Sequence, residues 1–318
     1  MVRYLSRNQI DDQAYDRCIA LSPQRMIYAF SWYLDVVSPG WELLVADDYA
    51  FVMPLPVRKR YGVKAVIQPL FCHQLGLFAA DKTPDTADWD RFFRALYHHI
   101  RYIPSYQIHP ANTSERSTDS TQVLPLTNHV LNLQRPYSEL FAGYSKDRKT
   151  NLKRGLHYGW DFADTDDVEP LIDLFRNHNT AGIGRVAPGA YEQLRQLVAV
   201  LQRRQQVRIR VAVQNGRVEA GCLLVTDVNR VIHLFCSASP EGRKGNARTL
   251  ILDQFIREYA GKPLWFDFES PEVENLAAFN RSFGAESESY FRLVSNQLPE
   301  SVQFLHRIKK WLHQTLFP

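Results

Sequence analysis

A short loop with two glycines and two cations has the residue types that suit phosphate binding. It stands between an alternating apolar run that ends near Ser237 and an amphipathic stretch that begins at Ala247. Backbone N–H groups at a helix start favour an anion, and glycines let a phosphate approach the main chain closely. We predict that the N–H groups of residues 243–247 bind phosphate; a plain surface turn is the alternative. The candidate residues are Gly242, Arg243, Lys244, Gly245, Asn246 and Ala247.

Two carboxylates, Asp267 and Glu269, have the chemistry of a general base. They are two residues apart at the end of a predicted strand over residues 264–268, so both should point to one face. Acyl transfer to an amine requires the ammonium to lose a proton, and a partly buried carboxylate can have a pKa suited to accept it. Glu269 is the favoured base. The alternative is an ion pair with Arg248 or Arg281, or simple exposure to solvent.

A predicted helix over residues 146–158 is strongly basic, and its charge matches the net +4 of the whole chain. Charge elsewhere therefore nearly cancels. The helix suits the phosphates of a nucleotide- or lipid-linked precursor, or the backbone of a tRNA. The alternative is a solvated helix face. The candidate phosphate-binding residues are Lys146, Lys149, Lys153 and Arg154.

Several common functional motifs are missing from the sequence. There is no HExxH, Cys/His cluster, GxSxG, P-loop or GxGxxG pattern. We therefore predict no metal site, and set aside serine-hydrolase, kinase and Rossmann-type functions. The four cysteines are far apart without a CxxC, which favours reduced thiols. They are Cys18, Cys72, Cys222 and Cys236.

The order of predicted elements suggests a duplicated fold. Three alternating strands, a loop, a helix and a further strand follow one another from residue 207, and such a strand–helix–strand crossover makes its two strands parallel. A similar order recurs over residues 41–109. We predict two tandem domains of α/β (α+β) class, residues 1–126 and 127–318, each a mixed, mainly antiparallel sheet flanked by helices. The loop over residues 71–76 in the first copy lacks a second glycine, so we expect that copy to be degenerate. The elements predicted for the second copy are strands 207–213, 218–225, 231–237 and 264–268, and helices 247–259 and 273–281.

Residues 207–284 resemble the GNAT acyltransferase fold, and nearly the whole chain resembles the FemAB-like peptidoglycan aminoacyltransferases. The GNAT donor loop reads Gln/Arg-x-x-Gly-x-Gly/Ala; here Gly245 and Ala247 match the last two fixed positions and Gly242 replaces the first. The segments Tyr137–Leu140 with Arg148–Arg154, and Asp267–Ser270 with Ala278–Ala285 and Tyr290, also look like Fem-type sequences.

The resemblance implies two tandem GNAT-like domains and a bacterial acyl- or aminoacyltransferase. The donor would be acyl-CoA or aminoacyl-tRNA, as a co-substrate rather than a permanently bound cofactor. The acceptor would be an amine on a small molecule or cell-wall precursor, held between the two halves and attacking directly. No counterpart of the coiled-coil arm of some Fem-type enzymes is present. A non-catalytic anion- or RNA-binding protein on the same fold is the alternative.

Length and composition predict the number of domains, the charge of the ligand and the location of the protein. The chain of 318 residues is 45% hydrophobic and long enough for two domains, and its pI near 8.8 suits an anionic ligand without indicating DNA as a partner. No secretory leader and no apolar run of about 18 residues is present, so we expect a cytoplasmic protein. Residues 299–316 form a predicted amphipathic helix that either touches a membrane surface weakly or closes a domain.

Overall fold

The computed structural model describes residues 1–60, 62–109, 120–178, 186, 189–270 and 273–303, in two compact units. Unit 1 comprises Met1–Leu126 and Tyr290–Pro318, and unit 2 comprises Thr127–Ser289. The chain leaves unit 1 along β8 (Thr121–Asn132) and returns to it along β14 (Glu286–Asn296). The residues from Tyr290 onward thus belong with the first unit, unlike the expected second domain of residues 127–318.

Unit 1 contains a four-stranded antiparallel sheet with the order β1-β2-β3-β6. Strands β2 and β3 are almost wholly buried, because α1 packs on β3 and β6 while α3 packs on β1 and β2. The elements are β1 (Arg3–Leu5), η1 (Arg7–Gln9), α1 (Asp12–Leu21), η2 (Ile27–Ala29), α2 (Ser31–Val37), β2 (Glu42–Ala46), β3 (Phe51–Leu55), β6 (Phe78–Ala79) and α3 (Thr86–His99).

A second group of strands in unit 1 explains why its two chain segments belong together. Strand β7 (Tyr102–Ile108) pairs antiparallel with β14, with Tyr106 opposite Leu293. The first residue of β8 also joins β14, through the Thr121 and Ser295 hydroxyls 3.0 Å apart. A separate hairpin is formed by β4 (Val57–Arg60) and β5 (Val63–Val66). Pro56, which has no backbone N–H to donate, separates β4 from β3.

Unit 2 has a mainly antiparallel sheet whose strands follow the order β8-β13-β12-β11-β10-β9. The predicted hairpin is confirmed: Gln214 pairs with Arg217 across Asn215-Gly216, whose φ angles are 52° and 73°. The predicted parallel crossover is also confirmed, with Val231 beside Phe266. The strands are β9 (Asp161–Thr165), β10 (Val207–Gln214), β11 (Arg217–Thr226), β12 (Arg230–Ala238) and β13 (Trp265–Asp267).

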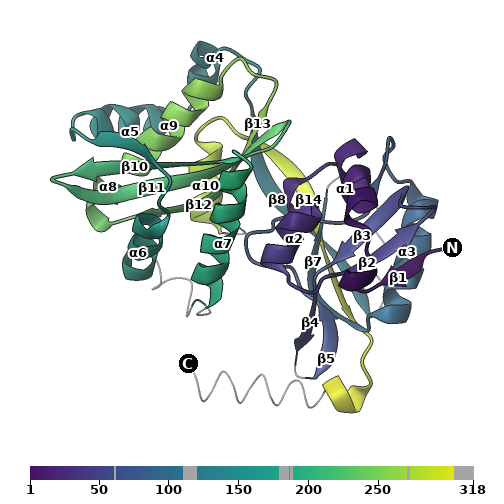
Figure 1. The fold of residues 1–318 in the computed structure, drawn as a ribbon. Helices are drawn as coiled ribbons and strands as arrows, with labels where there is room; N and C mark the ends of the chain where they lie inside the picture. The colour runs from purple at the N-terminus through teal and green to yellow at the C-terminus, as the bar shows by residue number, and fades with distance from the viewer. Residues whose placement is uncertain (61, 110–119, 179–185, 187–188, 271–272, 304–318) are drawn as a thin grey trace. The chain divides into compact units, whose positions relative to one another are not determined.

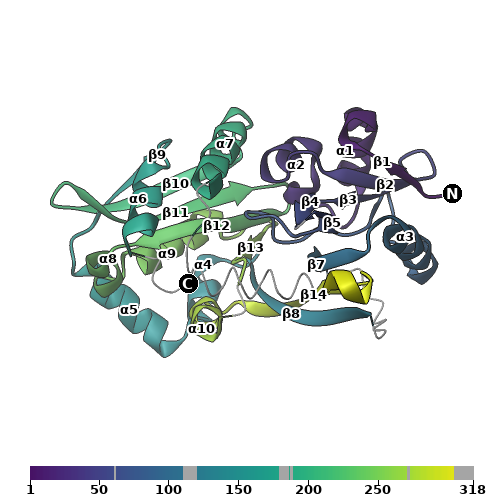
Figure 2. The same cartoon turned by 90° about the horizontal axis from the view of Figure 1, so that it is seen from below.

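Helices cover both faces of the unit 2 sheet. Helix α9 packs on β10, β11 and β12 with α5 against it, and α6 packs on the other face (Figure 1). The N-terminal end of α9 is surrounded by α5, α8 and α10 (Figure 2). The helices are α4 (Tyr137–Ala142), α5 (Lys146–Leu156), α6 (Glu169–His178), α7 (Gly189–Arg203), α8 (Pro240–Lys244), α9 (Ala247–Tyr259) and α10 (Glu274–Arg281).

The helix expected over residues 299–316 lies largely outside the described residues, which end at Gln303. Within the described part of the chain, no helix combines the length and apolar character needed to cross a membrane. The same residues contain no group of three or more His, Cys, Asp or Glu side chains placed to hold a metal ion.

Candidate functional site

A pocket of about 210 Å³ opens at the N-terminal end of α9. Four helices contribute to it, and five of its eight lining residues come from the chain segment that the sequence singled out and its continuation into α9. The lining residues are Arg148 and Asn151 of α5, Gly242 and Arg243 of α8, Asn246, Arg248 and Thr249 at the start of α9, and Phe279 of α10.

The start of α9 offers backbone donors to this pocket. Asn246 adopts a left-handed conformation, with φ 54°, and no side chain among the described residues caps the helix. The bond from Leu250 N–H to the Asn246 carbonyl, 3.2 Å long, begins the intrahelical ladder. The N–H groups of Ala247, Arg248 and Thr249 precede that ladder and lie at the positive end of the helix dipole. They are donors suited to an anion.

Arg148 gives the pocket a buried positive charge. Its side chain donates from Nη1 to Thr249 Oγ1 at 2.6 Å and from Nε to Ser282 Oγ at 2.8 Å. Burial, and then the nearby charge of Arg248, lower its pKa to about 10. The guanidinium therefore remains charged at neutral pH, at a cost that a bound anion would offset.

Arg248 brings a second positive charge against the same ring. The Arg148 and Arg248 guanidinium carbons lie 4.2 and 4.5 Å from the centroid of Phe279. Within the described residues, neither arginine forms an ion pair with a carboxylate. Two desolvated cations at an uncapped helix start are an arrangement that favours phosphate over a neutral ligand.

The two loop glycines have a packing role in this structure. A Cβ on Gly242 would lie 2.1 Å from the carbonyl oxygen of Glu219 in β11, and one on Gly245 would lie 2.3 Å from the Trp160 ring. Trp160 Nε1 also donates to the Gly245 carbonyl at 2.9 Å. Protein atoms thus fill the space that we expected a phosphate to approach.

The backbone donors differ from those expected. The N–H groups of Arg243, Gly245 and Asn246 donate to the carbonyls of Ser239, Glu241 and Arg243. Of the predicted donors in residues 243–247, Ala247 remains at the open helix start. The side chains of Arg243 and Asn246 line the pocket, whereas Lys244 is exposed outside it.

The lysine stripe of α5 lies on another face of that helix. Lys146, Lys153 and Arg154 are exposed, and Lys149 Nζ donates to the Ala142 carbonyl at 2.8 Å. Arg148, from the same basic run, is the residue of α5 that is buried beside the pocket. A charged residue within a charged run is usually solvated, so this burial could not be predicted from the sequence alone.

Asp267 is fully buried, and both of its carboxylate oxygens accept hydrogen bonds. It forms an ion pair with Arg230 Nη1 at 2.6 Å and accepts from Asn128 Nδ2 at 2.8 Å. The ion-pair alternative named Arg248 or Arg281, but the partner is Arg230, which also pairs with Glu288 at 2.8 Å. This geometry suits a structural carboxylate.

Glu269 lies beyond the strand rather than on it. Strand β13 ends at Asp267, and the Glu269 N–H donates to Asp267 Oδ1 at 2.9 Å. Its φ is 44°, a left-handed conformation that is uncommon for a residue with a side chain. The two carboxylates therefore do not share one strand face, and neither is among the described residues that line the pocket.

A buried polar network that the sequence did not indicate follows β13. Ser270 Oγ lies 2.9 Å from His129 Nδ1 and accepts from Asn280 Nδ2 at 2.7 Å. Asn128 accepts from the Ser270 N–H, which links this network to Asp267. Burial lowers the pKa of His129, so its ring is neutral at pH 7. Helix α10 connects the network to the pocket, because Asn280 follows Phe279.

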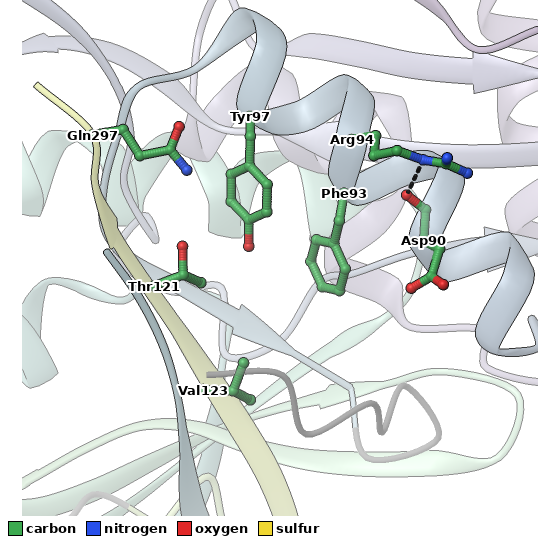
Figure 3. A pocket seen from close by; sticks show the side chains of 7 residues that line it. All are labelled: Asp90, Phe93, Arg94, Tyr97, Thr121, Val123 and Gln297. Atoms are coloured by element: carbon green, nitrogen blue, oxygen red, sulfur yellow. Dashed lines mark hydrogen bonds between the residues drawn. The ribbon is translucent and has the colours of Figure 1, made fainter. Parts of the chain in front are cut away.

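Unit 1 contains a second pocket, of about 410 Å³ (Figure 3). Phe93 and Tyr97 project into it from α3, and Arg94 Nε donates to the Asp90 carbonyl at 3.3 Å along the same helix. The lining is more apolar than that of the pocket at α9. It comprises Asp90, Phe93, Arg94, Tyr97, Thr121, Val123 and Gln297.

Comparisons with known proteins bear on the class of this chain. Residues 143–271 match the family model described as an acetyltransferase (GNAT) domain. A search of curated proteins found no significant match to the sequence.

Solved structures share the fold of the whole chain at low identity. The chain is similar to FemX, with a TM-score of 0.62 and 10% identity over 93% of this chain and 98% of that one. It is similar to the C-terminal domain of a putative lysylphosphatidylglycerol synthetase from Agrobacterium fabrum, with a TM-score of 0.56 and 12% identity over 95% and 97% of the chains. A tandem GNAT protein from the clavulanic acid biosynthesis pathway gives a TM-score of 0.55 and 11% identity over 94% and 99%.

The family match identifies residues 143–271 as a GNAT-type acyltransferase domain. More narrowly, the likeness to FemX and to the tandem GNAT protein extends over both units, so the chain has the FemAB-like, tandem form of the GNAT fold. The predicted class and fold are thereby confirmed.

Proposed function

We propose that unit 2 binds the phosphate groups of an acyl donor at the start of α9 and transfers the acyl group to an amine. The observation that carries the proposal is the placement of Arg148 and Arg248 against the ring of Phe279, without a carboxylate partner in the described residues, at an uncapped helix N-terminus. An anion there would accept from the amides of residues 247–249 and offset two desolvated charges.

The donor is acyl-CoA or aminoacyl-tRNA, both of which present phosphates. Acyl-CoA is supported by the likeness to the tandem GNAT protein, whose solved structure is the form without AcCoA. The acceptor is an amine on a small molecule or a cell-wall precursor. The amine nitrogen attacks the acyl carbonyl carbon, the bond to the thiol sulfur or ribose oxygen breaks, and the amine proton passes to a base.

Glu269 is the proposed base. Its half-buried carboxylate sits in a strained backbone conformation, and such strain often persists where a side chain must be held for function. Asp267 accepts from the Glu269 N–H and so acts as a positioning residue.

Binding of CoA and of inorganic pyrophosphate by titration calorimetry tests the phosphate site. Arg248→Gln removes one cation while keeping a polar side chain, and should weaken both ligands about tenfold or more. Lys153→Gln, a matched change on the exposed face of α5, should leave affinity within about twofold. Equal affinities for the wild-type and Arg248→Gln proteins would contradict the site.

A non-catalytic anion- or RNA-binding protein is the second candidate. It is favoured by the exposed Lys146, Lys153 and Arg154 on the helix that also supplies Arg148. A turnover measurement distinguishes the acyltransferase from the binding protein. With acyl-CoA or aminoacyl-tRNA and an amine acceptor, Glu269→Gln should reduce the rate by about 10²–10⁴-fold with little change in melting temperature. Glu274→Gln, an exposed change in α10, is the control. Tight donor binding without turnover in the wild-type protein would favour the binding protein.

A further inference from the structure

Two cysteines lie opposite each other on neighbouring strands of the unit 2 sheet. Cys222 of β11 and Cys236 of β12 are directly opposed in the antiparallel register, and both are free thiols. Opposed residues in such a pair share one face of the sheet and have Cα atoms about 4.5–5.5 Å apart, within the range that a disulfide bridges. The other two cysteines, Cys18 and Cys72, are in unit 1.

Cys236 is also connected to the pocket. Arg248 Nη1 donates to Cys236 Sγ at 3.6 Å, while the same guanidinium lies over Phe279 in the pocket lining. The sulfur and any bound phosphate therefore interact with one cation. Nothing in an acyl-transfer role for the pocket requires a thiol at this position.

The two sulfurs differ in reactivity. Burial raises the pKa of Cys236, but His233 and Arg248 more than offset this and bring it to about 6. Burial raises the pKa of Cys222 well above its ordinary value. Cys236, which is partly exposed, is thus the sulfur that loses its proton more readily, whereas the fully buried Cys222 retains its proton more strongly.

We propose that Cys222 and Cys236 form an oxidisable dithiol, and that its closure to a disulfide strengthens anion binding at Arg248. Formation of the disulfide is supported by the cross-strand geometry. Its effect on anion binding rests on the proposed phosphate site.

The chemistry needs a two-electron oxidant such as hydrogen peroxide. The Cys236 thiolate attacks one peroxide oxygen, the O–O bond breaks, and a sulfenic acid and hydroxide form. The Cys222 sulfur then attacks the Cys236 sulfur, the S–S bond forms, the S–O bond breaks, and the thiol proton leaves with the departing oxygen as water. Two thiols have lost two electrons, and peroxide has been reduced to water.

The direction of the effect follows from charge. In the reduced protein the Cys236 thiolate partly neutralises Arg248. The disulfide removes that negative charge, so the full charge of the guanidinium is available to a phosphate. The lost charge is one unit, on the Cys236 sulfur, and it lies several ångström from a phosphate bound at Arg248 in a partly desolvated site. Pyrophosphate should therefore bind about three- to tenfold more tightly.

The test uses the full-length protein with diamide, an oxidant that joins paired thiols, followed by non-reducing peptide mapping. Pyrophosphate affinity is measured by calorimetry before oxidation, after it, and after reduction with dithiothreitol. The map should contain a Cys222–Cys236 disulfide, and the tightening should reverse on reduction. In Cys222→Ala diamide should leave affinity unchanged, whereas Cys18→Ser should behave like the wild type.

Two results would overturn the proposal: a map without the Cys222–Cys236 disulfide, or the disulfide with unchanged pyrophosphate affinity. If the wild-type protein binds no pyrophosphate in either the reduced or the oxidised form, the phosphate site and its coupling to the thiols both fail. The peptide map would still decide the dithiol, so the two failures can be told apart.

Discussion

Two enclosed arginines of unit 2, Arg148 and Arg230, differ in what neutralises their charge. Arg230, whose side chain is 12% exposed, lies between two carboxylates, Asp267 and Glu288. Arg148 is equally enclosed but contacts hydroxyls and aromatic rings instead. The first arrangement is complete without a ligand. The second leaves a positive charge for which an anion is the natural partner.

The buried pair of Arg230 predicts a large effect of a small substitution. Asp267→Asn keeps the shape of the side chain but removes its charge, so Arg230 retains only Glu288. We expect a loss of about 3–5 kcal/mol in the free energy of unfolding, measured in urea. Asp173→Asn removes the partner of Arg176 in an exposed pair and should cost less than about 1 kcal/mol. Similar losses for both variants would contradict a structural role for Asp267.

The lowered pKa of Cys236 predicts a pH dependence of its reactivity. Thiolates react with iodoacetamide and thiols do not, so the alkylation rate at Cys236 should rise as pH increases through about 6. Arg248→Gln removes one of the two groups that lower the pKa, and the midpoint should move upward. A wild-type midpoint at the value of an ordinary thiol, near 8.5, would show that His233 and Arg248 do not stabilise the thiolate. Mass spectrometry at several pH values gives the profile.

At the scale of elements, the loop before α9 depends on close packing at Gly242. Gly242→Ala would place a methyl group 2.1 Å from the Glu219 carbonyl oxygen, so α8 must move away from β11. We expect a loss of about 1–3 kcal/mol in unfolding free energy, together with weaker pyrophosphate binding because Arg243 moves with α8. Gly189→Ala at the start of α7 meets no described atom within 4 Å, and should be neutral or slightly stabilising. Unchanged stability in Gly242→Ala would contradict this packing.

The elements that the sequence predicted are those with a strong local pattern. Alternation from Val207 to Val213 and the Asn215-Gly216 turn identify the β10–β11 hairpin, and the apolar face of residues 247–259 identifies α9. Strand β14 was missed because its first residues, Glu286 to Ser289, are polar or charged on both faces. The first residues of β8 carry no strand pattern of their own, because they adjoin a Ser- and Thr-rich run over residues 113–121.

The site was only partly predictable because its main features come from tertiary contacts. The segment that lines the pocket at α9 could be singled out from the sequence, since a glycine-containing turn before a helix is a local signal. The burial of Arg148 was not, because it depends on Phe279 and Phe283, which are remote in sequence. The role of the two glycines was also invisible, since Glu219 and Trp160 come from other strands and loops.

At the scale of the whole chain, the division into two compact units predicts two unfolding transitions. A ligand that binds only folded unit 2 should raise one transition and leave the other in place. Pyrophosphate at about 100 times its dissociation constant should stabilise that transition by about 2.7 kcal/mol. Differential scanning calorimetry measures both. The shift should be lost in Arg248→Gln, and an equal shift of both transitions would contradict binding confined to unit 2.

The return of the chain along β14 has a consequence for biosynthesis. Tyr106 in β7 pairs with Leu293, and the whole of unit 2 lies between these two residues in the sequence. The ribosome must therefore translate all of unit 2 before the first unit can complete its sheet, a delay on the order of ten seconds or more at usual elongation rates. During that interval the edge of β7 is open to other nascent chains, so a chaperone that shields exposed strands would act on this protein while it is still being made.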